Sequence, residues 1–191
     1  MRKDGTGAGL TDVDGDRMLE FVERQQAEPF FLFFSMTTPH TPISPSKPFQ
    51  GKSGISPYAD LLMETDWSIG QVIKALDTNG IADDTLVIFT ADNGTSPVCK
   101  FLELKKKNVN LNNHWRGHKA DAYEGGHRVP FMVRWPGKIK PATKSDQTIS
   151  LVDIMATCAD AAGQKLPDTA AEDSVSLMPV LKGESPNVPL H

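Results

Sequence analysis

Residues 86–94 read Leu-Val-Ile-Phe-Thr-Ala-Asp-Asn-Gly, and this stretch decides the fold of the chain. Its short apolar run predicts a strand buried on both faces of a parallel sheet. Ligands of open α/β sheets gather at the carboxyl ends of such strands. Asp92 and Asn93 are therefore predicted to present two hard oxygen ligands where a Ca²⁺ or Mg²⁺ ion would bind. The alternative is ordinary turn chemistry, which Asp-Asn-Gly also supports.

Helical and strand patterns lie on both sides of this stretch. Before it, we expect a helix from Thr11 that is broken by Pro29, a central strand at 30–34, and a helix at 58–78 with the apolar face Leu62, Ile69, Ile73 and Leu76. After it, we expect a long polar loop at 95–118 and a strand at 129–135. Ser150 then caps a helix with the apolar face Leu151, Ile154, Met155 and Cys158, and a short helix follows at 176–181. This order predicts an α/β fold with a mostly parallel sheet sandwiched by helices.

The composition of the 191 residues is that of a soluble globular protein, with 39% hydrophobic and 23% charged residues and a net charge of −4. No basic face is in excess, which argues against nucleic acid as the main partner. The longest apolar run, 30–34, is too short to cross a bilayer, so no membrane partner is expected. The start of the chain has no apolar segment of a signal peptide, and the compartment stays unassigned. Cys99 and Cys158 have no ligand spacing and need not pair.

Two basic side chains follow predicted elements in positions suited to anion binding. His40 sits between Pro39 and Pro42, where the restricted backbone would hold the imidazole for donation to an anionic oxygen. Lys119 ends the run from Arg116 and could clamp a sulfate or phosphate oxygen as a point charge. The alternatives are a structural histidine that bonds its own loop and a solvated surface lysine.

Three further features favour structural roles. His114 and His118 have a spacing that suits zinc on a helix, but Gly117 between them and the lack of a clear third ligand make this weak. The paired glycines of Glu124-Gly125-Gly126 predict close approach of the backbone or a positive φ. Asp66 lies on the apolar side of its helix, where a buried acid is expected to satisfy backbone groups.

Six motifs in register resemble the sulfatase family, in particular its arylsulfatase A-like and N-acetylgalactosamine-6-sulfatase-like members. The resemblance covers residues 12–184. The motifs are Pro39-His40-Thr41-Pro42, Phe89-Thr90-Ala91-Asp92-Asn93-Gly94, Gly117-His118-Lys119, Tyr123-Glu124-Gly125-Gly126-His127-Arg128-Val129-Pro130, Trp135-Pro136-Gly137 and Ser176-Leu177-Met178-Pro179-Val180-Leu181-Lys182-Gly183.

The resemblance implies an alkaline-phosphatase-like core that hydrolyses aryl or carbohydrate sulfate esters. It makes Asp92 and Asn93 ligands of Ca²⁺, with Mg²⁺ possible, and makes His40 and Lys119 the catalytic residues that bind the sulfate and the ester oxygen. Its substrates would be sulfated small molecules or glycans. Family members are often periplasmic, secreted or lysosomal.

Other family features are missing from the sequence. The formylglycine that sulfatases make from a Cys/Ser-x-Pro/Ala-Ser-Arg motif has no counterpart, because neither Cys99 nor Cys158 fits and no serine does. The paired aspartates of the family's first strand are also absent. Residues 1–191 are therefore expected to form a partial sulfatase catalytic domain that is inactive by itself and associates through exposed sheet edges. The alternatives are a phosphoesterase or phosphonate hydrolase of the same superfamily, and a non-catalytic module that binds sulfate or glycans.

Overall fold

The computed structural model describes residues 10–24 and 28–189, with the side chains of α1 described from residue 17. The chain divides into two units, one of residues up to 81 with 90–131, the other of residues 82–89 with 132–191. The elements are α1 (Leu10–Arg24), α2 (Pro57–Thr78), the 3-10 helix η1 (Ala82–Asp84), β1 (Val87–Thr90), the 3-10 helix η2 (Pro97–Cys99), α3 (Phe101–Lys106), α4 (Glu124–His127), β2 (Phe131–Arg134), α5 (Asp153–Ala161) and α6 (Met178–Leu181). Among the described residues, no helix is long and apolar enough to cross a membrane.

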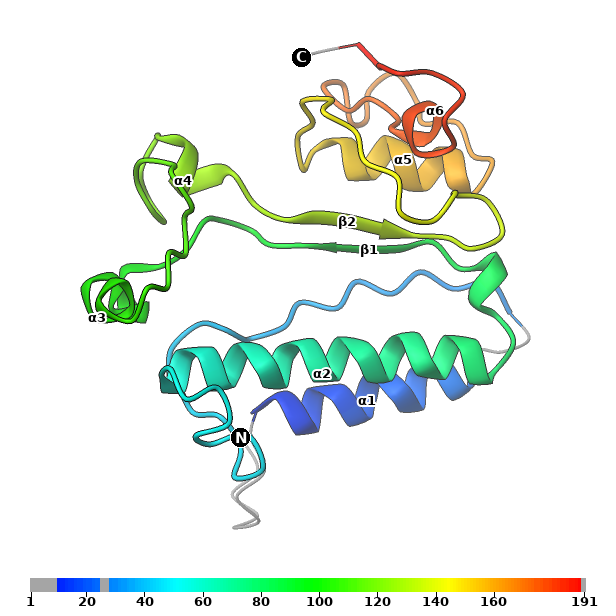
Figure 1. The fold of residues 1–191 in the computed structure, drawn as a ribbon. Coiled ribbons are helices and arrows are strands. Elements are labelled where there is room, and N and C mark those ends of the chain that lie inside the picture. The colour runs from blue at the N-terminus through cyan, green and yellow to red at the C-terminus, as the bar shows by residue number, and fades with distance from the viewer. Residues whose placement is uncertain (1–9, 25–27, 190–191) are drawn as a thin grey trace. The chain divides into compact units, whose positions relative to one another are not determined.

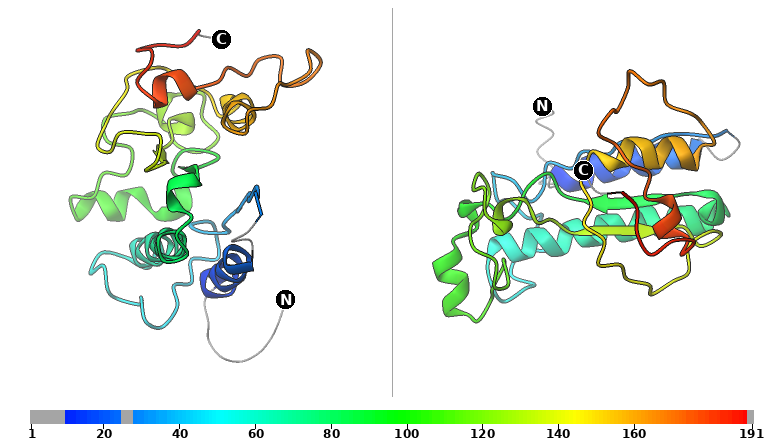
Figure 2. Two further views of the ribbon diagram at one scale, coloured as in Figure 1. Left: turned by 90° about the vertical axis from the view of Figure 1, so that its right-hand side faces the viewer. Right: turned by 90° about the horizontal axis from the view of Figure 1, so that it is seen from above.

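Two long helices form the core of the first unit. Helix α1 packs along α2 (Figures 1 and 2). The α1 side chains Met18 and Val22 are buried, as is Leu61 of α2. Helix α2 begins where Ser56 accepts a hydrogen bond from the amide of Ala59 at 3.2 Å, and it ends before Asn79. Both helices lie close to their predicted ranges.

The buried face of α2 is largely polar, which corrects the sequence prediction. Asp60, Glu64 and Ser68 recur at four-residue spacing and are all buried. Of the predicted apolar face, Leu76 is buried, but Leu62 is exposed, and so is Asp66. The physical reason is that this face contacts a loop with unpaired backbone amides rather than an apolar layer. Carboxylates satisfy such amides, and leucine cannot.

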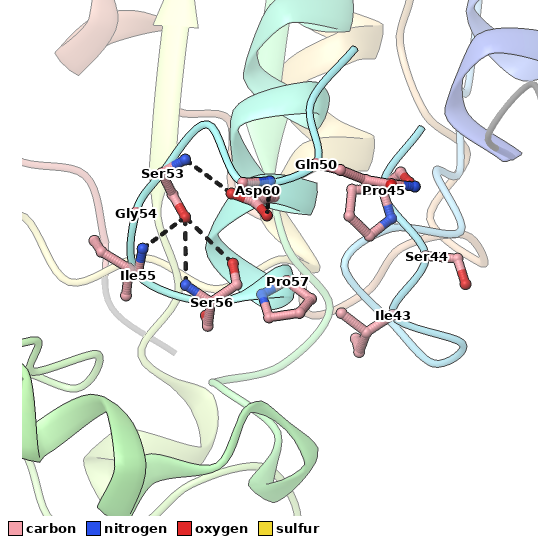
Figure 3. Close-up of a pocket in the computed structure, with 11 residues that line it drawn as sticks. Ile43, Ser44, Pro45, Gln50, Ser53, Gly54, Ile55, Ser56, Pro57 and Asp60 are labelled. Atoms are coloured by element: carbon pink, nitrogen blue, oxygen red, sulfur yellow. Dashed lines mark hydrogen bonds between the residues drawn. The ribbon is translucent and has the colours of Figure 1, made fainter. Parts of the chain in front are cut away.

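Asp60 shows how this contact works. Its two carboxylate oxygens accept hydrogen bonds from the amides of Gly51 and Ser53, each at 2.8 Å, at a pocket that the loop shares with the start of α2 (Figure 3). Burial of the carboxyl raises the pKa of Asp60, but the hydrogen bonds from Ser53 and Gly51 outweigh burial and bring the pKa below its usual value. Asp60 therefore stabilises this loop in its charged form.

Replacing Asp60 with asparagine is expected to lower the free energy of unfolding by about 1–3 kcal/mol at pH 7, because one amide loses its acceptor. The folded pKa of Asp60 lies below the unfolded value of about 3.9, so its stabilisation is present above pH about 4 and is lost as the pH falls through the folded pKa. The difference between wild type and Asp60→Asn should therefore shrink in acid. Urea unfolding of both proteins between pH 2.5 and 7 measures this difference in the free energy of unfolding.

Asp66→Asn on the same helix is the matched control, because Asp66 is exposed. It should leave stability almost unchanged at every pH. Equal effects of the two substitutions, or a pH-independent effect of Asp60→Asn, would contradict this role of Asp60.

The predicted strand at 30–34 is extended but pairs with no other strand among the described residues, and Figure 1 draws it as a plain tube without an arrow. Its side chains alternate in exposure. Phe31 and Phe33 are 72% and 82% exposed, while Phe30 is half-buried and packs edge-on against Phe21 of α1, with ring centroids 5.6 Å apart. The alternation is that of a strand, but no neighbouring strand supplies hydrogen bonds or cover.

The sheet consists of β1 and β2, as predicted at 86–90 and 129–135, and Figure 1 shows the two strands running in opposite directions. All four residues of β1 are half-buried rather than buried on both faces, because β2 is the only strand beside β1 in the described part of the chain. In the same unit, the indole N–H of Trp135 donates to the carbonyl of Asp83 at 2.9 Å.

Helix α5 differs from its prediction at the start and in its buried face. Ser150 does not cap the helix; its amide instead donates to Asp153 at 2.8 Å. The buried residues are Asp153 and Thr157, whereas Met155 is exposed. Thr157 accepts a hydrogen bond from the amide of Leu177 at 3.0 Å, so polar side chains of α5 hold the chain that leads into α6.

Candidate functional site

The Asp-Asn-Gly turn follows β1 and leaves oxygen atoms at the surface. Asp92 is exposed and Asn93 is half-buried. The side-chain amide nitrogen of Asn93 donates to the carbonyl of Gly94 at 3.0 Å, so its oxygen is the atom left for a ligand. Both residues therefore keep the hard oxygen donors that the sequence predicted.

Glycines let three distant motifs pack backbone against backbone. The amide of Gly94 donates to the carbonyl of Gly126 at 2.8 Å. A Cβ atom on Gly94 would lie 1.9 Å from the carbonyl oxygen of Gly125, and one on Gly125 would lie 2.2 Å from that of Gly117. The predicted close approach at Glu124-Gly125-Gly126 is confirmed, and only glycine fits these positions. Residues 94, 117, 125 and 126 are called the glycine cluster below.

Lys119 is joined to the turn through its backbone. Its amide donates to the carbonyl of Thr95 at 2.9 Å, next to Gly94, and the amide of Gly125 donates to the carbonyl of Arg116 at 2.8 Å. The structure thus brings the segments that carry Asp92, Asn93 and Lys119 together, although they are far apart in the sequence.

The other cations around the glycine cluster are engaged. The guanidinium of Arg116 lies 3.8 Å from the ring centre of Tyr123. That of Arg128 lies 4.2 Å from the ring centre of Trp115 and pairs with Glu124 at 2.7 Å. Lys119 is half-buried, and its ammonium group has no ion pair or acceptor within the described part of the chain. It is the cation that is left for an anionic ligand.

His40 lies on a separate loop of the same unit and is exposed. The peptide bonds before Pro39 and Pro42 on either side of it are cis. Its Nδ1 lies 3.1 Å from the carbonyl oxygen and 3.2 Å from the hydroxyl oxygen of Thr41, so Thr41 occupies this ring nitrogen. Nε2 is then the ring nitrogen available to a ligand.

An apolar cluster connects the His40 loop with the segment that follows the Asp-Asn-Gly turn. Ile43 and Ile55 pack against the buried cluster of Tyr58, Cys99 and Leu104. Burial, followed by the nearby thiol Cys99, raises the pKa of Tyr58 to about 12, so its phenol stays neutral at physiological pH. The loop and the 99–104 segment therefore share one buried cluster.

The polar stretch 95–118 is partly helical, which corrects its prediction as a loop. It contains η2 and α3, and Leu104 of α3 is buried. Phe101 of α3 stacks on the ring of His118, with centroids 5.7 Å apart, next to Lys119. The sequence signal of α3 is only six residues long and was too short to show a period.

The described residues contain no group of three or more His, Cys, Asp or Glu side chains that could hold a metal ion. The ring of His114 packs at a tilt against Trp115, and that of His118 stacks on Phe101, so the two histidines of the weak zinc spacing contact different aromatic rings. Asp92 and Asn93 offer three side-chain oxygens, two from the carboxylate and one from the amide, which is short of the six to eight that Ca²⁺ takes. Cys99 and Cys158 are both free.

Comparisons with known proteins place these features in context. The sequence profile described as Sulfatase matches residues 4–164. An N-acetylgalactosamine-6-O-sulfatase of Bacteroides thetaiotaomicron is 37% identical over 180 residues, which cover 92% of this chain and 35% of that protein. Human steryl-sulfatase is 39% identical over 166 residues, which cover 87% of this chain and 28% of that protein. The chain thus spans about a third of the length of these relatives.

A solved sulfatase structure from Bacteroides thetaiotaomicron, described with the metabolism of multiple glycosaminoglycans, superposes with a TM-score of 0.86. It is 35% identical and covers 94% of this chain and 38% of that one. This likeness confirms the predicted α/β fold, of which the two-stranded sheet here is a small part.

Proposed function

Because this chain belongs to the sulfatase family, we propose that it forms the part of a sulfuric ester hydrolase that binds the sulfate group of a carbohydrate sulfate. The observation that carries this proposal is the half-buried Lys119, held at the glycine cluster beside the Asp-Asn-Gly turn with its charge unpaired among the described side chains. A sulfate oxygen is the ligand that such a cation would bind.

The similarities favour a carbohydrate over an aryl or steroid substrate. The relatives include an N-acetylgalactosamine-6-O-sulfatase and the solved structure associated with glycosaminoglycan metabolism. The match to steryl-sulfatase makes a steroid sulfate the alternative. In this chain we propose that Lys119 binds a non-bridging sulfate oxygen.

His40 would act on the ester oxygen. Breaking the S–O bond leaves the electron pair on the alcohol oxygen of the sugar. A protonated Nε2 of His40, with Nδ1 already donating to the carbonyl of Thr41, would transfer its proton to that oxygen and so stabilise the leaving group.

The metal and the nucleophile are further parts of this proposal. Asp92 and Asn93 would supply two of the oxygen ligands of Ca²⁺, or of Mg²⁺, and the ion would offset negative charge on the sulfate. Two ligand residues alone would bind such an ion weakly. No formylglycine motif occurs in residues 1–191, and we propose that this chain by itself does not turn over.

Calorimetry with a matched ligand pair tests the proposal. N-acetylgalactosamine 6-sulfate should give saturable heat at millimolar concentration, and more in the presence of Ca²⁺, while N-acetylgalactosamine without sulfate should give none. Equal heats for the two sugars, or none for either, would rule out sulfate recognition by this chain.

We also propose that the chain associates with a second copy through the extended segment 30–36. This segment has no strand partner among the described residues, and Phe31 and Phe33 expose most of their rings. No charged residue lies between Pro29 and Pro39 to oppose pairing. An uncharged, unpaired strand edge with aromatic side chains favours association with an identical edge.

Phe33→Lys is expected to raise the dissociation constant of this association by about tenfold or more, because the lysine removes an aromatic contact and repels its copy. Sedimentation velocity over a concentration series measures the change. Leu102→Lys is the control, since Leu102 is as exposed but lies on α3. A wild-type chain that stays monomeric at high concentration would refute the proposed association.

A further inference from the structure

Helix α2 holds the chain on both sides of His40. Before the histidine, the hydroxyls of Thr65 and Thr38 share a hydrogen bond of 2.9 Å. After it, the amide of Ser46 donates to Glu64 Oε2 at 2.9 Å. His40 therefore lies on a short loop whose two ends are tied to neighbouring positions of one rigid helix.

Glu64 is an unusual residue for this place. Its side chain is 0% exposed, and among the described residues it has no cationic partner. Its second oxygen, Oε1, and the hydroxyl of Ser46 are both buried without a hydrogen-bond partner in the described structure. Burying a carboxylate without a counter-charge is costly, and an apolar residue would avoid that cost. Glu64 therefore holds the loop through the Ser46 amide and does not act as a packing residue of the core.

The two hydrogen bonds that hold the loop ends, Thr65 with Thr38 and the Ser46 amide with Glu64, need polar side chains that an apolar helix face would lack. Thr65 also bonds the carbonyl of Leu61 in its own helix, at 2.8 Å, which fixes its hydroxyl for the contact with Thr38. Farther along the loop, the Asp60 contacts described above tie a third point to the same face of α2. The polar face of α2 is thus a template for the path of the loop.

We propose that Glu64 and Thr65 are positioning residues for His40. They fix both ends of its loop and thereby the geometry in which Nδ1 donates to the carbonyl of Thr41 and Nε2 is offered to the substrate. This inference rests on the proposed function, because that function gives His40 its role at the ester oxygen.

The test measures the His40 ring directly, in the whole chain and without sulfate. Long-range ¹H–¹⁵N NMR distinguishes the tautomer protonated at Nδ1 from the one protonated at Nε2. Wild type should show mainly the Nδ1–H form. Glu64→Leu should move the ratio of the two His40 tautomers to the ratio found for a histidine in a free peptide. It should also speed hydrogen exchange at the Ser46 amide about tenfold or more, because that amide loses its acceptor.

Glu64→Gln should restore both signals, since its amide oxygen still accepts from Ser46. If Glu64→Leu does not fold, Thr65→Val gives the second test, because valine keeps the shape of threonine and removes the bond to Thr38. Thr65→Val is expected to change the tautomer ratio in the same direction.

Ser68→Ala is the matched control on the same buried face, because the Ser68 hydroxyl donates to the Glu64 carbonyl of its own helix and, among the described residues, makes no bond to the loop. It should leave the His40 signals unchanged even if stability falls. Unchanged His40 signals in Glu64→Leu and Thr65→Val, or an equal change in Ser68→Ala, would overturn the inference. Failure of the wild type to bind the sulfated sugar would instead refute the proposed function and leave this result intact.

Discussion

Gly126→Ala is expected to lower the free energy of unfolding by about 3 kcal/mol or more, the upper end of the range for overpacked sites. A Cβ atom at position 126 would lie 2.0 Å from the carbonyl oxygen of Asp121, which is backbone and cannot rotate away. The shift needed to relieve this contact would also disturb the hydrogen bond from the amide of Gly94 to the carbonyl of Gly126. Urea unfolding at pH 7 measures the loss.

Gly70→Ala is the control for this substitution. Gly70 lies inside α2, and a Cβ atom there would meet nothing within 4 Å. Alanine should therefore raise the free energy of unfolding by about 0.5–1 kcal/mol through its better helix propensity. If Gly126→Ala were as stable as wild type, the close packing of the glycine cluster would be wrong.

Lys119→Met is expected to weaken binding of N-acetylgalactosamine 6-sulfate by about ten- to a hundredfold. Methionine keeps much of the side chain's length and apolar character but removes the charge that would donate to a sulfate oxygen, a contact worth about 1.5–3 kcal/mol. Competition calorimetry or NMR titration measures the change in affinity.

Lys105→Met controls for the loss of one positive charge, because Lys105 is exposed in the basic run on α3. It should change the affinity little. If the two substitutions weakened binding equally, sulfate would be attracted by overall charge rather than bound at Lys119.

The sequence identified the pieces of the candidate site but not all of their contacts. The Asp-Asn-Gly turn follows a predicted strand, and the structure shows that strand as β1. Paired glycines at 125 and 126 indicated close approach of the backbone. Their partners at 94 and 117 are distant in sequence, and no local pattern connects them. Single-sequence patterns describe local structure, whereas these contacts are set by tertiary packing.

The polar face of α2 was missed because leucines and isoleucines at helical spacing suggested an apolar face. Asp60, Glu64 and Ser68 recur at the same spacing, and this repeat was the signal that could have found the face. Burial of these residues depends on a loop with free amides, which periodicity alone does not show. The strand predicted at 30–34 differs for a related reason. A strand forms only where a neighbouring strand supplies hydrogen bonds, and the local sequence does not show whether one is present.

NMR titration with inorganic sulfate, compared with chloride at matched ionic strength, shows whether the Asp-Asn-Gly turn, Lys119 and His40 of this sulfatase chain bind one sulfate group. We expect saturable shifts of the Thr95 and Lys119 amides and of the His40 ring, all with the same midpoint. Shifts confined to the basic run at 105–107, or shifts that chloride reproduces, would contradict binding of one sulfate by these residues.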